Sequence, residues 1–465
     1  MSWLRAMLMS AFMTATLIAC SPPPDPPVPQ DLASMDAGTR QAVERAIEFV
    51  RSNPNEPRAW MQLGHVYLAH QLAPQAAECM DHLAASNPSA QVHTMHAIAL
   101  DQLGDTDARR TAIDAAIATD GKHTIPLWRG ALWALETGDL NRAADLAQKA
   151  AEHPKAGYTD TTVLATVRLT QGRSQEAVDL MTPLVARRNT DRHAHWVLGR
   201  ALLANDQRDE AHRHLVLAGP GTTSFYDPWT QEYEQMRADF TARIAYVATL
   251  AKGGQLQQAN AAIENVRLMY GERREIELAQ ATIAFMNGRH NQSEAMLNTL
   301  IQAWPKWFPP HGQQAKQLLQ RAQSNSDAVM LERARTAAED GVIISPGKPE
   351  GWLLLGRIAR KQGDDVAALA AMNNAVELAP DRLVPRLARA ELLAIAGQPQ
   401  AALDALDLDE RIFGQTLPIS LLRVQSLVAI GRHDDAIALF KKCQQEAPTN
   451  QKVRRMATLL ERAGL

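Results

Sequence analysis

The residues best suited to chemistry in this chain are four histidines that stand close together in the sequence. His193 and His195 form one His-x-His pair, and His212 and His214 form a second. Imidazole is a common zinc ligand, so one ring from each pair could meet at a metal. Residues two apart on a helix point about 200° apart, however, so the four rings cannot all converge. Because no carboxylate or thiolate stands beside them at helical spacing, we predict no metal and no other cofactor.

The sequence lacks the usual motifs of catalysis. It contains no G-x-S-x-G elbow, no P-loop and no H-E-x-x-H pair. The net charge of −3 gives no field that would draw the chain to nucleic acid. We therefore predict that the protein is not an enzyme, has no small-molecule substrate and does not bind nucleic acid.

The three cysteines are too few and too scattered for a disulfide framework. Cys79 and Cys443 lie almost the whole chain apart, so we expect both to stay unpaired. Each falls on a predicted second helix, where we expect Cys443 to behave as a small apolar side chain.

The N-terminus has the layout of a secretory signal. Arg5 precedes an apolar run over 6–19, which is too short for an ordinary spanning helix. The residues Leu17, Ile18, Ala19 and Cys20 then resemble the lipobox of bacterial lipoproteins. The resemblance implies a signal peptide over 1–19 that is cut before Cys20, which receives the lipid. An ordinary secretory signal with a chance cysteine is the alternative.

A lipid on Cys20 implies a protein held on a membrane of the bacterial cell envelope and facing the periplasm. Several acyl chains hold a protein stably, whereas a single chain binds only marginally. The residue that follows, Ser21, is typical of sorting to the outer membrane in enteric bacteria. Residues 20–35 then carry a proline-rich stretch, which we interpret as an extended tether.

The remaining sequence favours an all-α protein that can position such groups. Only 5% of its residues are aromatic, and alanine, leucine and glutamine are frequent while β-branched runs are scarce. Six marker residues stand in register over 58–88: Trp60, Leu63, Gly64, Tyr67, Ala76 and Pro88. This pattern resembles the tetratricopeptide repeat, whose period is about 34 residues. The resemblance implies a right-handed α-solenoid of antiparallel helix pairs, because each repeat buries its apolar face against its neighbours.

The repeat frame divides the chain into segments. After the signal peptide (1–19) and tether (20–35), we predict an N-terminal array (36–218), an inserted aromatic loop with a connecting helix (219–239), middle repeats (240–307), a degenerate repeat (308–348), C-terminal repeats (349–450) and a capping helix (451–465).

In tetratricopeptide arrays, positions 2, 5, 9 and 12 of each repeat face a concave surface that binds protein or peptide partners. The resemblance therefore implies a binding strip on the first helices, with the candidates Trp128, Leu132, Trp196, Arg200, Arg357 and Arg360. Exposed tryptophans would serve as interface anchors. The alternative is that Trp128 and Trp196 are simply buried against the next repeat.

These observations predict a lipid-anchored extracytoplasmic scaffold that binds proteins on its concave face and supports assembly of an envelope complex. An alternative is an accessory lipoprotein that binds a ligand or glycan through the aromatic residues of the 219–231 loop. Those aromatics would instead be structural if they plug the end of a helical segment.

Overall fold

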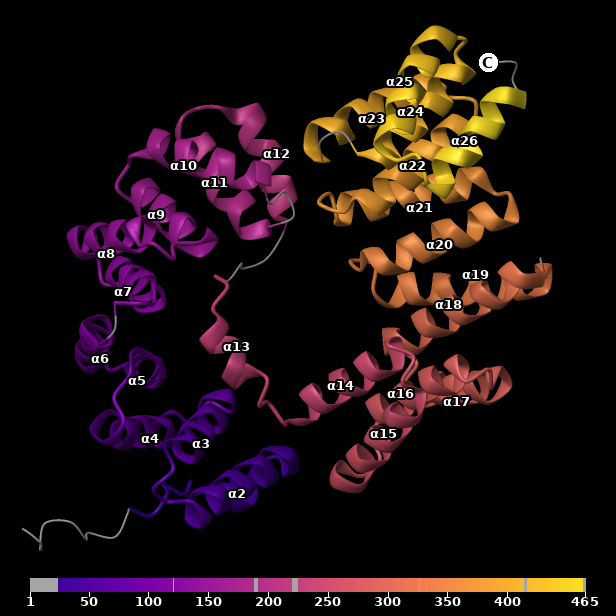
Figure 1. Ribbon diagram of the computed structural model, residues 1–465. Helices are drawn as coiled ribbons and strands as arrows, with labels where there is room; N and C mark the ends of the chain where they lie inside the picture. Colours follow the sequence, from indigo (N-terminus) through magenta and orange to yellow (C-terminus); the bar gives the residue numbers. More distant parts are fainter. Residues whose placement is uncertain are drawn as a thin grey trace, which may run out of the picture. The chain divides into compact units, whose positions relative to one another are not determined.

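The computed structural model describes residues 24–119, 121–187, 191–219, 225–325, 327–413 and 416–462. Within these ranges the chain is all-α, and most consecutive helices pack against one another (Figure 1). The predicted solenoid of antiparallel helix pairs is confirmed. No helix in the described ranges combines the length and the apolar character needed to cross a membrane. The predicted signal peptide and Cys20 lie outside the described residues.

The chain forms two compact units, which we call unit 1 and unit 2. Unit 1 comprises the described residues up to Ala156 together with Tyr226–Arg243. Its elements are η1 (Leu32–Ser34), α2 (Ala37–Ser52), α3 (Pro57–Ala69), α4 (Ala73–Ser86), α5 (Ala90–Leu103), α6 (Thr106–Thr119), α7 (Ile125–Glu136), α8 (Leu140–Glu152) and α13 (Pro228–Glu234).

Unit 2 comprises Gly157–Phe225 and Ile244–Leu465. Its elements begin with α9 (Tyr158–Thr170), α10 (Ser174–Arg187), α11 (Arg192–Ala204) and α12 (Arg208–Ala218), and resume with α14 (Phe240–Lys252), which starts in unit 1. They continue with α15 (Leu256–Tyr270), α16 (Arg274–Met286), α17 (His290–Ala303), α18 (Phe308–Asn325), α19 (Ala328–Ile344), α20 (Pro349–Gln362), α21 (Asp365–Leu378), α22 (Leu383–Ile395), α23 (Pro399–Phe413), α24 (Leu417–Ala429), α25 (His433–Glu446) and α26 (Gln451–Arg462).

This division cuts through the N-terminal array predicted over 36–218. The helices α9–α12 cluster with the later part of the chain, because α12 packs against α23 and Arg192 lies 3.5 Å from Asp381. A repeat period reports only which helices are neighbours in sequence, so it carries no sign of this contact.

Four first helices share a hydrogen bond at their fourth residue. In each, a side-chain nitrogen donates to the backbone carbonyl of a proline in the preceding turn: Trp60 to Pro54 (2.9 Å), His311 to Pro305 (3.2 Å), Trp352 to Pro346 (2.8 Å) and Arg386 to Pro380 (2.8 Å). The bond satisfies a carbonyl that the turn would leave without a partner. It also ties the start of one repeat to the end of the one before.

The His311 bond shows where the degenerate repeat begins. Its first helix, α18, starts at Phe308, directly after the Trp304–Trp307 turn. The tetratricopeptide markers are recognisable only over 315–348, because both helices of this pair are longer than those of the other repeats. The aromatic and proline residues at 304–310 are thus a turn and a helix start.

The proline-rich stretch is docked on unit 1 from Pro26 onwards. Pro26 and Pro29 are buried, and the hydroxyl of Tyr67 donates a hydrogen bond to the carbonyl of Pro27. Tyr67 is itself fully buried, so this bond satisfies a hydroxyl with no access to water. The prediction that the whole stretch is a free tether is therefore wrong for the part after Asp25.

Candidate functional site

The short helix α13 packs on the face of unit 1 that is formed by α3, α5 and α7, the first helices of their pairs. We call this surface the first-helix face of unit 1. Asp227 caps the start of this helix: its carboxylate oxygen Oδ1 accepts a hydrogen bond from the backbone N–H of Trp229 at 2.9 Å, and Pro228 is the first helical residue. An aspartate cap followed by proline is a strong start signal for a helix. Because the helix begins at Pro228, the loop predicted over 219–231 ends four residues earlier than expected. Residues 220–224 of that loop lie outside the described residues.

A buried charge pair holds the start of α13 against α7. Nε of Arg129 donates to Oδ2 of Asp227 at 2.7 Å, and Nη2 of the same guanidinium contacts the same oxygen. Asp227 is only 4% exposed. A pair between charged groups at this depth is stronger than a surface ion pair, because little water competes for the two partners.

Aromatic and polar side chains complete this contact along α13. Trp229 and Tyr233 are both buried, the first beside His123 (ring centroids 5.2 Å apart) and the second beside His65 (6.4 Å). Gln91 of α5 donates to Glu232 at 2.7 Å. Residues from α3, α5 and the start of α7 therefore converge on one face of α13.

Two groups in this contact have shifted acidities. Burial lowers the pKa of His65 to about 4 and raises the pKa of Tyr233. Both side chains are therefore neutral near pH 7, and Asp227 is the charged group of α13 that the face buries.

The candidates on α7 are largely enclosed. Trp128 is 3% exposed, and the guanidinium of Arg129 lies 5.2 Å from its ring centre. Leu132 is half-buried. Of the two alternatives for Trp128, the structure places the ring inside the fold.

The candidates on α11 in unit 2 are accessible. Trp196 is 38% exposed, Arg200 is exposed, and the guanidinium lies 5.9 Å from the indole centre. His193 stacks beside the same indole at 6.0 Å. This surface offers an aromatic ring with a cation next to it.

A pocket lies on the face of unit 2 that is formed by the first helices of its helix pairs, which we call the first-helix face of unit 2. It has a volume of about 440 Å³ and is formed by α18, α20 and α22. Its lining is mostly apolar and consists of Phe308, Pro309, Gly312, Gln313, Lys316, Glu350, Leu353, Leu354, Arg357 and Val384. The predicted groove residue Arg357 therefore borders this pocket. The apolar residues of α18, Phe308 and Pro309, escaped the sequence analysis, because α18 begins before the recognisable repeat.

The second predicted arginine of this repeat is already paired. Arg360 forms a two-pronged ion pair with Glu391 of α22, with one bond of 2.7 Å, and Glu391 raises the pKa of the guanidinium. Glu350 is likewise bound to Arg382 at 2.6 Å. By contrast, Arg357 and Lys316 have no ion-pair partner in the part of the chain that the structure describes.

The histidines of α11 and α12 meet in one pair. Nδ1 of His195 lies 2.8 Å from Nδ1 of His214, and both rings are buried. One ring donates and the other accepts. Burial together with its histidine neighbour lowers the pKa of His214 to about 4, so His214 is neutral near pH 7. Among the described residues, no three potential ligands gather as a metal site would require.

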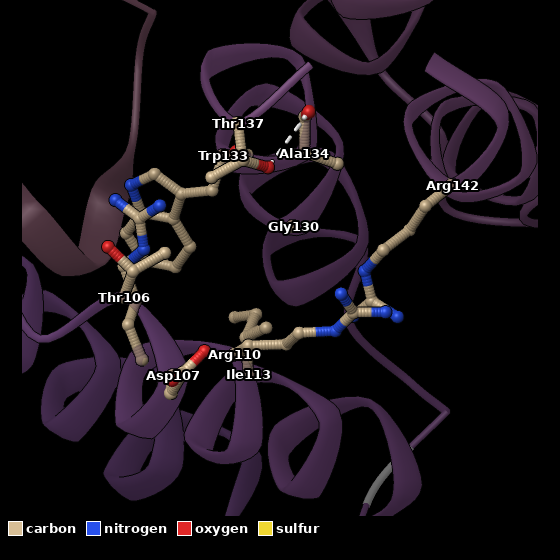
Figure 2. A pocket seen from close by; sticks show the side chains of 10 residues that line it. Thr106, Asp107, Arg110, Ile113, Gly130, Trp133, Ala134, Thr137 and Arg142 are labelled. Carbon is tan, nitrogen blue, oxygen red and sulfur yellow. Dashed lines mark hydrogen bonds between the residues drawn. The ribbon is translucent and has the colours of Figure 1, made fainter. Parts of the chain in front are cut away.

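A smaller pocket of about 210 Å³ lies among α6, α7 and α8 in unit 1. Figure 2 shows Arg110 and Arg142 pointing toward one another across it. Arg142 is paired with Asp114, and Arg110 lies 3.9 Å from Asp139. These pairs leave little unbalanced charge for an anionic ligand.

The aromatic residues of the 219–231 loop differ in accessibility. Trp229 is buried under the contacts described above, Phe225 is half-buried, and Tyr226 is 61% exposed. A sugar stacks on an open ring face, so the burial of Trp229 speaks against this alternative. The sequence signal that could have located α13 was the Asp-Pro pair at 227–228.

Comparison with known proteins supports the repeat assignment. The tetratricopeptide repeat family model matches residues 162–211 and 317–382. No curated protein matches the chain in sequence.

Several solved structures align with parts of the chain at low identity. PilF of Pseudomonas aeruginosa is 13% identical, with 47% of this chain and 96% of that chain covered and a TM-score of 0.39. PilW, described as a type IV pilus biogenesis factor, is 15% identical, with 47% and 98% covered and a TM-score of 0.40. The Cut9–Hcn1 complex is 12% identical, with 90% and 92% covered and a TM-score of 0.38. The match of the family model assigns tetratricopeptide repeats to residues 162–211 and 317–382 of this chain.

Proposed function

We propose that this protein is a scaffold that binds a protein partner on the first-helix face of unit 2, at the pocket formed by α18, α20 and α22. The observation that carries the proposal is an apolar pocket bordered by two cations without ion-pair partners among the described residues. The role is binding without catalysis.

The pocket has the makeup of a peptide-binding surface. Val384 is 67% exposed, and Leu353 and Phe308 are each only partly covered. Exposed apolar side chains gathered in a hollow indicate an interaction site, since a scattered arrangement would need no explanation. The neighbouring Lys316 and Arg357 favour a carboxylate on the occupant. We infer an occupant that carries a bulky apolar side chain next to an acidic residue.

Site-specific photo-crosslinking in intact cells tests this site. A crosslinker in place of Leu353 should capture a discrete partner, and one in place of Val366 should not. Val366 is 83% exposed and lies on the second helix α21, outside the pocket lining, which makes it a matched control. Adding Arg357→Glu should then reduce the Leu353 product at least about tenfold, because it reverses the charge beside the apolar pocket. Identical products from both positions would remove the proposal.

The location that we propose is the bacterial cell envelope, with the lipid on Cys20 holding the scaffold on the periplasmic side of a membrane. The support is the order of Arg5, the apolar run and the lipobox-like residues before Cys20. An anchored scaffold would concentrate its partner at the membrane, which suits assembly of an envelope complex.

A further inference from the structure

Segment 227–233 resembles a peptide ligand bound to unit 1, both in its short length and in its contacts. A repeat helix of this chain is followed by an antiparallel partner of similar length, whereas α13 has seven residues and packs chiefly on α3, far away in the sequence. A helix this short is unstable alone in water, so its surroundings must order it. Those surroundings are the first helices of the array, which is the helix-in-groove mode of peptide binding.

We propose that the first-helix face of unit 1 is a binding site for short helical peptides with a carboxylate at the first position and aromatic side chains two and six positions later, and that segment 227–233 occupies this site in cis. The proposal goes beyond the function assigned to unit 2, because it concerns a separate face with its own recognition chemistry.

The carboxylate is recognised by a guanidinium that is already held in place. Arg129 lies 5.2 Å from the ring centre of Trp128 and 5.9 Å from that of Trp133, on its own helix α7. Stacking on two rings restricts the arginine side chain before any peptide arrives, so less entropy is lost on binding. Thr230 reinforces the pair by donating to the same oxygen of Asp227 at 2.9 Å.

Each of the two aromatic side chains lies beside a histidine ring of the face. Trp229 and Tyr233, two and six residues after Asp227, lie beside His123 and His65. Gln91 donates a hydrogen bond to the carboxylate of Glu232, and Nε2 of His70 accepts a hydrogen bond from the backbone N–H of Ala238 at 3.3 Å. These contacts specify a carboxylate, two aromatic rings and a short helix.

The site is not sealed around its occupant. A cavity of about 410 Å³ lies beside the end of α13, with a largely polar lining: Thr39, Leu68, Ala69, His70, Gln71, Gln102, Tyr233, Glu234, Arg237 and Asp239. Polar space of this size holds water, so the end of α13 can leave the face without opening a dry void. A competing peptide therefore has a route onto the face.

Because segment 227–233 already occupies the site, it determines how tightly a competing peptide must bind. A segment tethered in the same chain has an effective concentration of about a millimolar, so a free peptide must outcompete it. Weakening the resident segment should raise the apparent affinity for a free peptide, since the apparent dissociation constant falls as the open fraction rises.

The experiment uses the full chain and a fluorescent synthetic peptide of residues 225–239. The double variant Asp227→Ala/Trp229→Ala should bind the peptide at least about tenfold more tightly than the wild type, measured by fluorescence anisotropy. Gln231→Ala is the matched control, because this side chain is exposed on the same helix, and it should bind like the wild type. Adding Arg129→Gln to the double variant, or using a peptide with Asp227→Asn, should abolish the gain.

Two results would overturn the proposal: a folded double variant that fails to bind the peptide, or a wild type that binds it equally well. Circular dichroism establishes folding. If the double variant has lost its helical signal, Asp227→Asn in the full chain replaces it, because it keeps the side-chain shape, and the same criterion applies.

Discussion

Arg386 is the residue at which the link between repeats coincides with a buried charge. Its Nε donates to the carbonyl of Pro380, while its Nη1 donates to Asp409 at 2.8 Å; Arg386 is 5% exposed and Asp409 is fully buried. We predict that Arg386→Met lowers the free energy of unfolding by about 3–5 kcal/mol, because it removes the hydrogen-bonded partner of a buried carboxylate.

Replacing both members of this pair should cost less than replacing one. In Arg386→Met/Asp409→Leu no buried carboxylate remains, so part of the lost stability should return. Arg382→Met is the control, since its partner Glu350 is exposed and surface pairs contribute only about 0–1 kcal/mol. Denaturant unfolding compares the variants, and a double variant as unstable as the sum of both single variants would contradict this account.

We predict that the pair formed by His195 and His214 in unit 2 makes the protein less stable in acid. The folded protein holds the pKa of His214 at about 4, below its ordinary value of 6.5. Between these values the unfolded chain binds a proton that the folded chain does not, so stability is present above pH 6.5 and is lost as the pH falls towards 4. The slope reaches at most about 1.4 kcal/mol per pH unit for one such ring.

Unfolding midpoints at about pH 7 and about pH 5 measure this slope. His195→Leu/His214→Leu should lose less stability on acidification than the wild type. His212→Leu should behave like the wild type, because His212 is exposed. Equal losses in all three proteins would show that other groups govern the acid response.

The role of a residue could be predicted from the sequence where that role depends on the size of its side chain. Trp60 and Trp352 stand out in the sequence as large residues, and both donate a hydrogen bond to a proline carbonyl in the preceding turn. His311 and Arg386 fill the same role through a donor nitrogen alone. A pattern that scores size and apolarity passes over them, although the hydrogen bond is the same.

At the scale of the element, close crossing of α11 and α12 depends on Gly199. A Cβ at this position would lie 2.8 Å from Cγ of Leu215 and 3.1 Å from its backbone nitrogen. We predict that Gly199→Ala lowers the free energy of unfolding by about 1–3 kcal/mol, because the two helices must move apart. Gly347→Ala is the control within unit 2, since a Cβ there meets no atom within 4 Å. Thermal unfolding monitored by circular dichroism distinguishes the two, and equal melting temperatures would refute the crossing argument.

Elements that follow the repeat period were predictable, whereas the bounds and contacts of elements that depart from it were not. Between residues 57 and 218 the helices follow one another in pairs at about the 34-residue period, because capping, proline and glycine signals recur with it. The helix α13 and the docked prolines after Asp25 depend on side chains that lie far away in the sequence, Arg129 and Tyr67 respectively. Tertiary contacts of this kind leave no periodic trace.

At the scale of the whole molecule, the docked prolines limit how far the array can stand from a membrane. If Cys20 carries the lipid, only the few residues before Pro26 separate the anchor from the folded unit 1. A fully extended chain spans about 3.5 Å per residue, so this reach is at most about 20 Å. An anchored array would therefore stay close to the bilayer surface.

The anchor itself is tested by Cys20→Ala in cells of the host bacterium. We predict that this variant incorporates no labelled fatty acid and leaves the membrane fraction, because one or more acyl chains provide the binding energy for the membrane. Cys79→Ala is the control, since Cys79 is a fully buried thiol in α4 with a pKa that burial raises, and it should stay lipidated and membrane-bound. The helical signal of both purified variants should match that of the wild type, which excludes unfolding as the cause of a change in location. A Cys20→Ala protein that remains with the membrane would mean that some other part of the chain, or a partner, holds it there.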